Sequence, residues 1–390
     1  MKMMMHLISP EKMSPQISSI PNLGNVEVIN ALRGVAALAV MWFHFTRPSA
    51  LIPSENSSFY SILTWSGNWG WMGVEMFFAI SGFILPYSMY RSRYQIRNLF
   101  TFLCKRITRL DPPYFASIVL ALALWWLASH LPFYKGPAFE LEYPRLFAHV
   151  GYLNDILGHP WHNVVFWTLA IEFQFYLLIA FFFPLIIHSS KIIRFLITPT
   201  LAAISLVFPF SNTVLAFLAF FALGMLTFQF YLRQIPSWFF WSTFPLIGFI
   251  AATQKTVASA CLASATCLAI IFIKQYHVQI LDYPMRTLTW MGTISYSLYL
   301  VHTIIGSKII SLGGRLSQSP LNATLTLATA CAASVVSAWL FYLVIERPSK
   351  YWATSIRYKQ KPDDIALEIK KSPQNESATY QSKHASERAA

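Results

Sequence analysis

The stretch INALRGVAALAVMWFHFT, residues 29–46, is long and apolar enough to cross a membrane as one helix, and its two ionisable side chains are Arg33 and His44. Eleven residues separate the two, close to three whole helical turns, so both side chains point to the same face. Ionisable groups in a membrane helix are costly and usually face protein or a water-filled cavity. The pair therefore indicates a functional face, with a snorkelling arginine and a hydrogen-bonded histidine as the alternative.

The whole chain has the composition of a membrane protein. Of its 390 residues, 55% are hydrophobic and 12% are charged, and the mean hydropathy is +0.48. Apolar stretches of sufficient length predict ten spans: 29–46, 69–90, 112–131, 163–188, 192–209, 213–232, 236–253, 256–273, 287–310 and 321–345. Pro199 and Pro245 fall inside two of them, which membrane helices tolerate where neighbours satisfy the freed backbone groups. We expect an all-α, polytopic bundle of about ten transmembrane helices.

The basic residues indicate how the bundle is oriented. With both termini in the cytoplasm, most of the 29 lysines and arginines lie on the inner side. The outer loops hold Arg47, Lys135, Arg145, Lys255 and Arg315. The densest inner cluster lies between the second and third spans and consists of Arg91, Arg93, Arg97, Lys105, Arg106 and Arg109. The net charge of +13 is therefore an orientation signal, and we expect no nucleic-acid partner.

Three segments follow from these patterns. Residues 1–27 form a cytoplasmic N-terminal segment without the pattern of a signal peptide, and residues 28–350 form the membrane domain. Residues 351–390 are polar and predict a disordered cytoplasmic tail. The four cysteines lack the spacing of metal ligands, so we expect no metal site. No internal repeat is visible, which weighs against a secondary transporter.

Depth along the predicted helices brings His44 and Glu75 to a similar level near the outer face. A carboxylate beside an imidazole would fix the tautomer of the imidazole and stabilise its charged form, so the two could act as a general base and its orienting partner. An incidental glutamate is the alternative for Glu75. Glu172 lies near the middle of the fourth span, where we favour a partner within the bundle, with Arg33 as one candidate.

Four further residues or residue pairs carry candidate roles. Ser81 and Gly82 lie at mid-depth and suggest close helix packing rather than a nucleophile. Arg106 and Arg109 share a helical face beside the membrane and suit phosphate groups, with a purely topological role as the alternative. His302 is a candidate second imidazole of the site, although a lone histidine is more often a packed one. Glu346 and Arg347 predict an ion pair that ends the last helix.

Five segments, taken together, resemble the integral-membrane acyltransferase family three. They are Asn30-Ala-Leu-Arg33-Gly34 with His44 following; Gly73-Val-Glu75-Met-Phe-Phe-Ala-Ile-Ser81-Gly82-Phe83; Arg106-x-x-Arg109-Leu-Asp-Pro112-Pro-Tyr114; Trp167-Thr-Leu-x-x-Glu172-x-Gln-Phe-Tyr176; and Ser295-Tyr-Ser-Leu-Tyr-Leu-x-His302 with Glu346-x-Pro348. A proline commonly follows the family's counterpart of His302, whereas Thr303 stands here. Many members also continue into a soluble esterase-like domain, which the sequence after residue 350 does not resemble.

The resemblance implies an enzyme of the cell (inner) membrane that takes an acyl group from cytoplasmic acyl-coenzyme A, with acetyl-coenzyme A as the expected donor. It implies transfer to a hydroxyl of a sugar or glycan at the outer side. It also implies His44 as the base, with Glu75, Arg33, Arg106, Arg109 and Glu172 as site or supporting residues. Ser81, Tyr114 and His302 are carried over as supporting positions.

We expect the acceptor oxygen to attack the thioester directly after His44 removes its proton, with Arg33, Ser295 or Tyr299 as candidate donors to the oxyanion. An acyl-enzyme intermediate is the alternative route. A transporter or flippase for a lipid-linked sugar is the second hypothesis, and an unrelated membrane O-acyltransferase of the His/Asn type is the third. The sequence indicates neither the identity of the acceptor nor the oligomeric state.

Overall fold

The fold was analysed in a computed structural model, which describes residues 26–47, 51–52, 58–132, 134–208, 212–276, 282–316 and 319–358. These residues form helices joined by short loops, and no β-strand occurs among them. The all-α class predicted from the sequence is therefore confirmed for this part of the chain. Almost all of the predicted N-terminal segment and residues 359–390 of the predicted tail lie outside the described residues.

Among the residues that the structure describes, six helical segments are long and apolar enough to cross a membrane. They are Glu27–Phe45, Ser58–Arg91, Ile96–Ser129, Phe166–Ile186, Val214–Tyr231 and Pro320–Ser355. The other four predicted spans also form helices: α9 (Lys191–Val207), α11 (Ser237–Gln254), α12 (Val257–Tyr276) and α14 (Ser295–Gly313). These four do not meet the same criterion of length and mean hydropathy, so a total of ten spans stays a prediction. Pro199 and Pro245 lie inside α9 and α11 without ending them, as expected.

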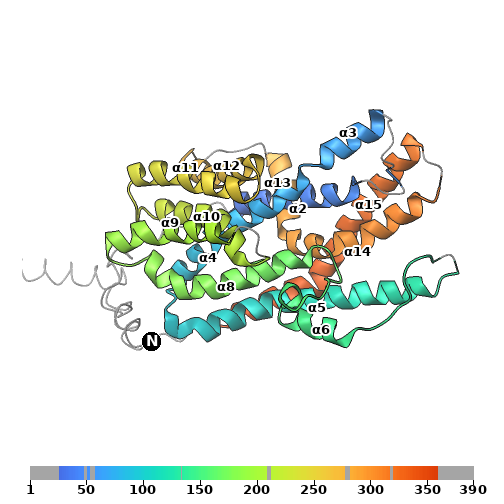
Figure 1. The fold of residues 1–390 in the computed structure, drawn as a ribbon, viewed down its shortest axis with the longest axis horizontal. Helices are drawn as coiled ribbons and strands as arrows, with labels where there is room; N and C mark the ends of the chain where they lie inside the picture. Colours follow the sequence, from blue (N-terminus) through green and yellow to red (C-terminus); the bar gives the residue numbers. More distant parts are fainter. Residues whose placement is uncertain are drawn as a thin grey trace, which may run out of the picture.

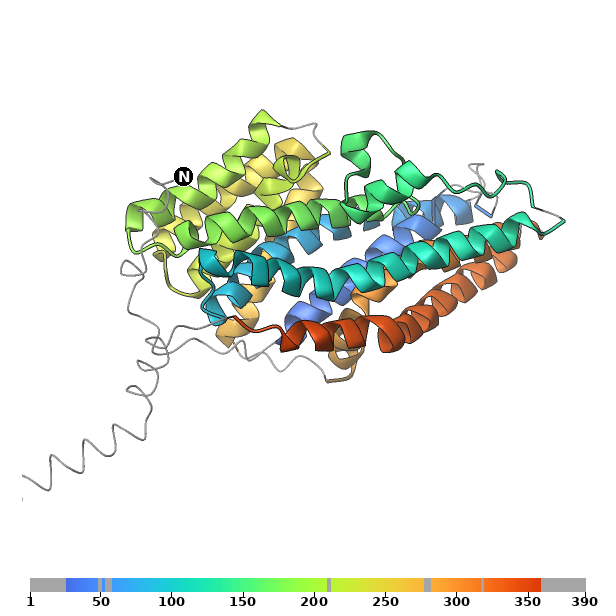
Figure 2. The ribbon, with the colours of Figure 1, turned by 90° about the horizontal axis from the view of Figure 1, so that it is seen from below.

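The long helices lie roughly side by side along one direction, as Figures 1 and 2 show. α4 (Gly73–Arg91) ends, α5 (Leu99–Ser129) begins and α8 (Phe166–Ile186) ends on the left of Figure 1, and we call this the Arg91 end. α5 finishes at the opposite end, which we call the Ser129 end; the segment after it carries the short helices α6 (Tyr143–Val150) and α7 (Asn154–Leu157). α10 (Leu218–Tyr231) packs against α4 in the middle of the bundle.

α5 corrects one predicted boundary. The apolar stretch in the sequence places the third span at 112–131. The helix instead begins at Leu99 and continues through Pro112 and Pro113. Arg106 and Arg109 therefore lie on the same continuous helix as that span.

Two glycines allow the helices around Arg33 and His44 to approach closely. A Cβ on Gly34 would lie 2.5 Å from the Leu288 carbonyl oxygen, so glycine is required where α2 (Val26–Phe45) crosses α13 (Asp282–Thr293). A Cβ on Gly306 of α14 would lie 2.0 Å from the ring of Phe45. At these two glycines α13 and α14 pack directly against α2. The start of α14 therefore lies next to Arg33, and the middle of α14 lies next to His44.

The chain after the last predicted span is folded further than expected. α15 (Pro320–Phe341) passes through one π-helical turn, Tyr342–Glu346, into α16 (Arg347–Ser355). Helix α16 packs against α5, and the ring of Tyr358 lies 6.1 Å from that of Tyr94. The boundary predicted at residue 350 is therefore too early, because the sequence after it is polar but still forms a helix with one face on α5.

Candidate functional site

A cavity of about 300 Å³ lies between α2, α4, α5, α8 and α14. It collects polar side chains from six separate parts of the sequence, these five helices and the π-helical turn Tyr342–Glu346. Those that line it are Arg33, Ser81, Tyr87, Ser88, Arg91, Arg106, Arg109, Thr168, Glu172, Tyr176, Ser295, Tyr296, Tyr299 and Glu346. Five of the residues singled out from the sequence, Arg33, Ser81, Arg106, Arg109 and Glu172, are therefore brought together in one place.

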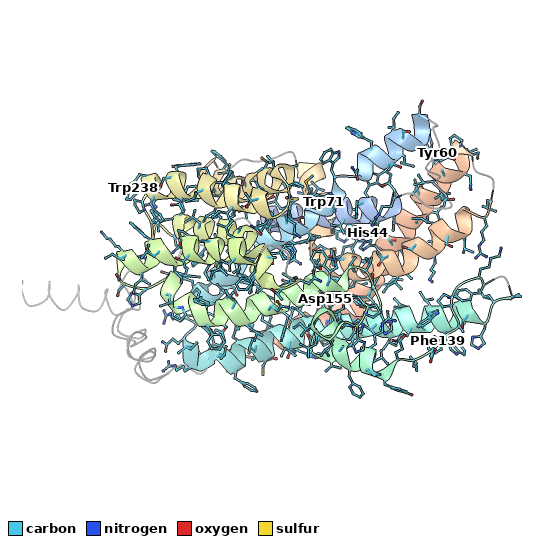
Figure 3. All side chains as sticks on the ribbon, in the orientation of Figure 1. His44, Tyr60, Trp71, Phe139, Asp155 and Trp238 are labelled. Atoms are coloured by element: carbon cyan, nitrogen blue, oxygen red, sulfur yellow. The ribbon has the colours of Figure 1, made fainter. Side chains whose placement is uncertain are left out.

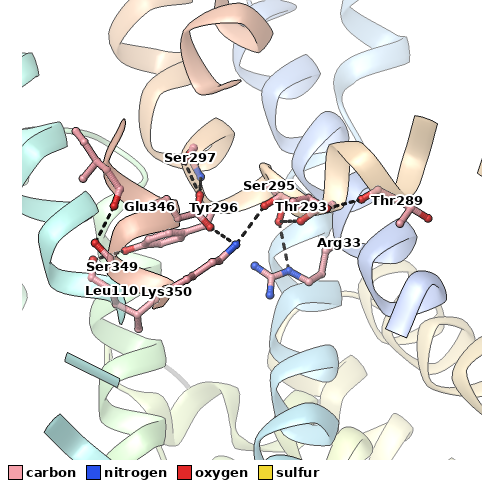
Figure 4. Close-up of polar contacts among 12 residues, drawn as sticks. Arg33, Leu110, Thr289, Thr293, Ser295, Tyr296, Ser297, Glu346, Ser349 and Lys350 are labelled. Carbon is pink, nitrogen blue, oxygen red and sulfur yellow. Dashed lines mark hydrogen bonds and ion pairs between the residues drawn. The ribbon is translucent and has the colours of Figure 1, made fainter. Parts of the chain in front are cut away.

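The cavity has an excess of positive charge. Four arginines line it against two carboxylates, those of Glu172 and Glu346. Glu346 is already neutralised, because its carboxylate lies 2.6 Å from the Lys350 ammonium and also accepts hydrogen bonds from the backbone and hydroxyl of Ser297 (Figure 4). Glu346 therefore forms its ion pair with Lys350 and not with the predicted Arg347. Residues four apart lie on the same face of a helix, whereas adjacent residues do not.

Arg33 enters the cavity from α2 with its charged end available. Its Nε donates to the Ser295 hydroxyl over 3.3 Å, as Figure 4 shows. Ser295 in turn donates to the Gly292 carbonyl, which fixes the hydroxyl at the turn between α13 and α14. Within the described residues the two terminal nitrogens of Arg33 form no hydrogen bond, so they can receive an anionic or carbonyl oxygen.

Glu172 is held by hydroxyls. Its carboxylate accepts a hydrogen bond from Tyr176 at 2.6 Å and one from Ser81 at 3.3 Å. A partner in the bundle is therefore confirmed, while a direct pair with Arg33 is not among the contacts of the described residues. Ser81 does not pack as expected: Gly82 faces α10, and the Ser81 side chain turns to the cavity instead.

Arg106 and Arg109 line the same side of the cavity, one turn apart on α5. The Arg106 guanidinium lies over the rings of Phe102 and Tyr176, at 5.3 and 5.7 Å from their centroids, and its Nε is buried without a hydrogen-bond partner. Such stacking holds an arginine in place while leaving donors free. Arg91, at the end of α4, adds a third cation toward the Arg91 end.

His44 pairs with a second histidine rather than with a carboxylate. Its Nδ1 lies 3.2 Å from Nε2 of His302 and 2.9 Å from the Val40 carbonyl oxygen. His302 is fully buried, and its own Nδ1 lies 2.9 Å from the Leu298 carbonyl oxygen. A ring nitrogen beside a carbonyl must carry the hydrogen, so Nε2 of neutral His302 is an acceptor. His44 then donates from Nδ1, and the free lone pair of its ring is on Nε2.

Glu75 is not next to His44, which corrects the predicted pair. α4 turns Gly73 toward α2, where a Cβ would meet the Ala36 carbonyl oxygen. Residues two apart on a helix point in nearly opposite directions, so Glu75 faces away from α2. Its side chain is buried, one carboxylate oxygen has no hydrogen-bond partner, and Lys255 acts on it electrostatically. The depth match was wrong as well: Gly67 approaches Trp42 and Thr46, whereas Gly73 approaches Ala36 and Val40, so Glu75 lies about two helical turns from the level of His44.

Tyr299 connects the cavity to the histidine pair. It lines the cavity, and its ring centroid lies 6.1 Å from that of His302, one turn further along α14. The Thr168 hydroxyl donates to the Val165 carbonyl, so in the 2.7 Å contact between Tyr299 and Thr168 the tyrosine donates. Neither His44 nor His302 lines the cavity, and Tyr299 is a lining residue whose ring neighbours that of His302.

The hydrogen bonds also distinguish between the candidate donors to an oxyanion. The hydroxyls of Ser295 and Tyr299 donate to Gly292 and Thr168, as described above, and that of Tyr296 donates to the Leu110 carbonyl. These protons are engaged within the protein. The terminal nitrogens of Arg33 are therefore the better placed of the predicted donors.

Tyr114 lies outside the cavity. It is fully buried, and its hydroxyl is 2.7 Å from Nδ1 of His149 in α6. His149 stacks on His162 with their ring centroids 4.9 Å apart. Burial lowers the pKa of His149 to about 3 and that of His162 to about 4, so both rings are neutral. No sequence pattern singles out this histidine pair, because its members lie thirteen residues apart in an irregular segment.

Thr303 occupies the position where the resembled family commonly has a proline. Its hydroxyl donates to Asn163 Oδ1 over 2.7 Å, and Asn163 Nδ2 donates to the Leu300 carbonyl over 3.0 Å. The departure from the family pattern therefore has a structural counterpart, since both contacts fasten the segment before α8 to α14 on either side of His302.

Comparisons with known proteins agree with this arrangement. A family model described as an acyltransferase domain matches residues 26–343. A protein of Acidianus two-tailed virus named "Putative acetyltransferase ORF330" is 28% identical over 183 residues, which cover 46% of this chain and 46% of the viral protein. The match thus spans less than half of that relative's length. No solved structure matches. Since the family model covers most of the chain, including every residue that lines the cavity apart from Glu346, the chain belongs to the integral-membrane acyltransferase family three.

Proposed function

We propose that the protein transfers an acyl group, with acetyl as the first candidate, from acyl-coenzyme A to a hydroxyl of a sugar or glycan. The observation that carries this proposal is that one residue, Tyr299, belongs both to the arginine-rich cavity and to the surroundings of the histidine pair. Tyr299 lines the cavity together with Arg91, Arg106 and Arg109, and its ring neighbours that of His302, the partner of His44. A site for a phosphate-bearing donor and a candidate base are thus linked by one side chain.

The donor enters at the Arg91 end. Coenzyme A carries several phosphate charges, and arginines bind phosphate oxygens well because their planar donors fit two at once. Arg91, Arg106 and Arg109 supply these donors. A volume of about 300 Å³ is small for a ligand pocket, so the acyl group and part of the pantetheine arm occupy it while the nucleotide stays at the mouth.

His44 acts as the general base through Nε2. The acceptor hydroxyl gives its proton to this nitrogen, and the acceptor oxygen attacks the thioester carbonyl. The carbon–sulfur bond then breaks, and the thiolate leaves with the proton that His44 received. The Val40 carbonyl and Nε2 of His302 share the hydrogen on Nδ1, which keeps the base in the required tautomer and orients its ring. General-base assistance of this kind is worth about 10²- to 10⁴-fold in rate.

Arg33 stabilises the oxyanion of the tetrahedral intermediate. Its terminal nitrogens are free for the carbonyl oxygen while Nε is held by Ser295. The Tyr299 side chain turns aside for the acceptor to reach the thioester, because it lines the cavity and its ring neighbours that of His302.

The orientation follows from the basic residues. With the Arg91 end in the cytoplasm, the donor comes from the cytoplasmic pool and the acceptor from the outer side of the cell (inner) membrane. The six apolar helices support a bilayer as the surrounding medium.

The first experiment measures release of free coenzyme A by purified protein in lipid nanodiscs, with acetyl-coenzyme A and a panel of sugar acceptors. We expect thiol release that requires an acceptor and is abolished by His44→Ala. His130→Ala, which removes an exposed histidine at the end of α5, is the matched control and should be unaffected. Acceptor-dependent release that persists in His44→Ala would leave the enzyme class standing and refute His44 as base. Folded wild-type protein that releases no thiol but moves a sugar across the membrane would support a transporter instead.

A further inference from the structure

A second cavity lies at the Arg91 end, separate from the first. It is bounded by the start of α9, the end of α10, the turn after α10 and the start of α11. The two cavities share no lining residue. The acyl-transfer mechanism therefore leaves this second cavity without a role.

The second cavity attracts anions. Lys191, Arg194 and Arg233 line it, and no carboxylate is among its lining residues. Arg194 is fixed in place, because one of its terminal nitrogens donates to the His188 carbonyl over 2.8 Å. Its Nε is buried without a hydrogen-bond partner, and so is the side-chain oxygen of Gln234 in the same lining. A buried donor without a partner costs free energy, so a ligand that accepts its hydrogen bond is favoured.

The backbone adds to this positive potential. α9 begins at Lys191 and α11 begins at Ser237, both at the cavity, and neither helix has a side-chain cap on its first N–H groups. Uncapped helix starts carry a partial positive charge and open N–H donors. They reinforce the side-chain cations and do not constitute the site alone.

The helices that bound the cavity carry exposed apolar side chains next to its lining residues. Ile192 and Leu196, which do not line the cavity themselves, follow each other at one-turn spacing on α9, with 70% and 60% of their surface exposed. Trp238 and Trp241 are exposed in the same way on α11, and Figure 3 places Trp238 at the outer edge of the Arg91 end. Tryptophan beside lysine and arginine is typical of the boundary between lipid and water. The ligand that fits has an anionic head and an apolar body.

We propose that this cavity binds the phosphate headgroup of an anionic phospholipid from the leaflet at the Arg91 end. The headgroup lies between Lys191, Arg194 and Arg233, and the acyl chains lie along the exposed faces of α9 and α11. The proposal does not depend on acyl transfer, since the donor cavity and the histidine pair lie elsewhere.

Native mass spectrometry of the detergent-purified full chain tests this, with phosphatidylglycerol, phosphatidylcholine and soluble glycerol phosphate as probes. The variant is the double substitution Lys191→Gln/Arg233→Gln, which spares the carbonyl contacts of Arg194. Each cation near a lipid headgroup contributes about 1 kcal/mol, so two lost charges should weaken phosphatidylglycerol binding about 30-fold. Phosphatidylcholine should bind weakly to both proteins.

The matched control removes two exposed charges outside the cavity, Arg347→Gln/Arg357→Gln, and should retain wild-type binding. Equal phosphatidylglycerol binding by wild type and Lys191→Gln/Arg233→Gln would overturn the proposal, as would equal losses in both double variants. Tight binding of glycerol phosphate alone would replace the lipid with a soluble phosphate ligand. The thermal melting temperature of each variant in detergent, measured in parallel, shows whether a loss of binding is a loss of fold.

Discussion

The hydroxyl of Thr303 donates to the side-chain oxygen of Asn163 over 2.7 Å, directly after His302 in the sequence. Asn163 is buried and also reaches the Leu300 carbonyl, so one side chain contacts α14 on both sides of His302. The histidine pair is therefore supported from α2 on one side and from the segment before α8 on the other. This support comes from a residue to which the sequence motifs assigned no role.

Asn163→Ala should destabilise the protein by about 1–3 kcal/mol, because it leaves the Thr303 hydroxyl and the Leu300 carbonyl without their partner. Thr303→Val removes one of these hydrogen bonds and should cost less. Thermal unfolding in detergent measures both. Equal melting temperatures for wild type and Asn163→Ala would contradict the proposed support.

His302→Ala should lower kcat for acyl transfer by at least about 10²-fold, the lower range of general-base assistance, and leave KM for the donor nearly unchanged. The physical reason is loss of one of the two acceptors, His302 Nε2 and the Val40 carbonyl, that share the Nδ1 hydrogen of His44 and hold the ring with its lone pair on Nε2. His302→Gln can supply a side-chain oxygen as acceptor and should restore part of kcat. If His302→Ala matched wild type in kcat, the role of His302 would be disproved.

Arg109→Gln should raise KM for acetyl-coenzyme A about tenfold, the effect of losing roughly 1.4 kcal/mol of phosphate binding. Acetyl-pantetheine carries the same thioester without the nucleotide phosphates, so its KM should be the same for wild type and variant. Steady-state kinetics with both donors separates phosphate binding from a general loss of structure, which would raise both values.

Glu75→Gln should reduce kcat by less than about tenfold, corresponding to under 1.4 kcal/mol of barrier. The expectation follows from the direction of the side chain, which faces away from α2 and the His44 ring. Thiol-release assays of Glu75→Gln beside His302→Ala compare the two candidate partners of the base. A collapse of activity in Glu75→Gln with normal thermal stability would restore the carboxylate as the orienting residue.

Stability should fall as the pH drops from about 6.5 toward 4. His149 and His162 have an ordinary pKa of 6.5, lowered by burial to about 3 and about 4 in the folded chain. Between these values the unfolded chain binds protons that the folded chain does not, so protonation favours unfolding. The double variant His149→Asn/His162→Asn should show a flatter dependence of melting temperature on pH. An unchanged slope would mean that other groups determine the acid sensitivity.

Composition and hydrophobic length were enough to predict an all-helical fold and a helix at each of the ten proposed spans. They did not predict where α5 begins, because the apolar stretch starts at Pro112 whereas the helix already begins at Leu99, in the basic segment before it. The continuation into α16 was missed for a related reason: a polar stretch can still form a helix when one face packs against another helix.

The sequence motifs predicted which residues belong to the candidate site better than they predicted which of these residues contact one another. Motif positions identified Arg33, Arg106, Arg109 and Glu172, which line one cavity. The pairing of His44 with His302 depends on the close approach of α14 to α2 at Gly306, which is a tertiary contact and leaves no local pattern. For the same reason Glu75 was assigned to the wrong neighbour.

The position of the Tyr299 ring bears on whether the acyl donor is lost to hydrolysis. A base that faced a bound thioester directly would activate water as readily as an acceptor, and the donor would be hydrolysed between turnovers. Under the proposed function, the Tyr299 ring keeps a thioester in the cavity away from that base until an acceptor arrives and the ring turns aside. The activated donor is then used for transfer and is not lost to water.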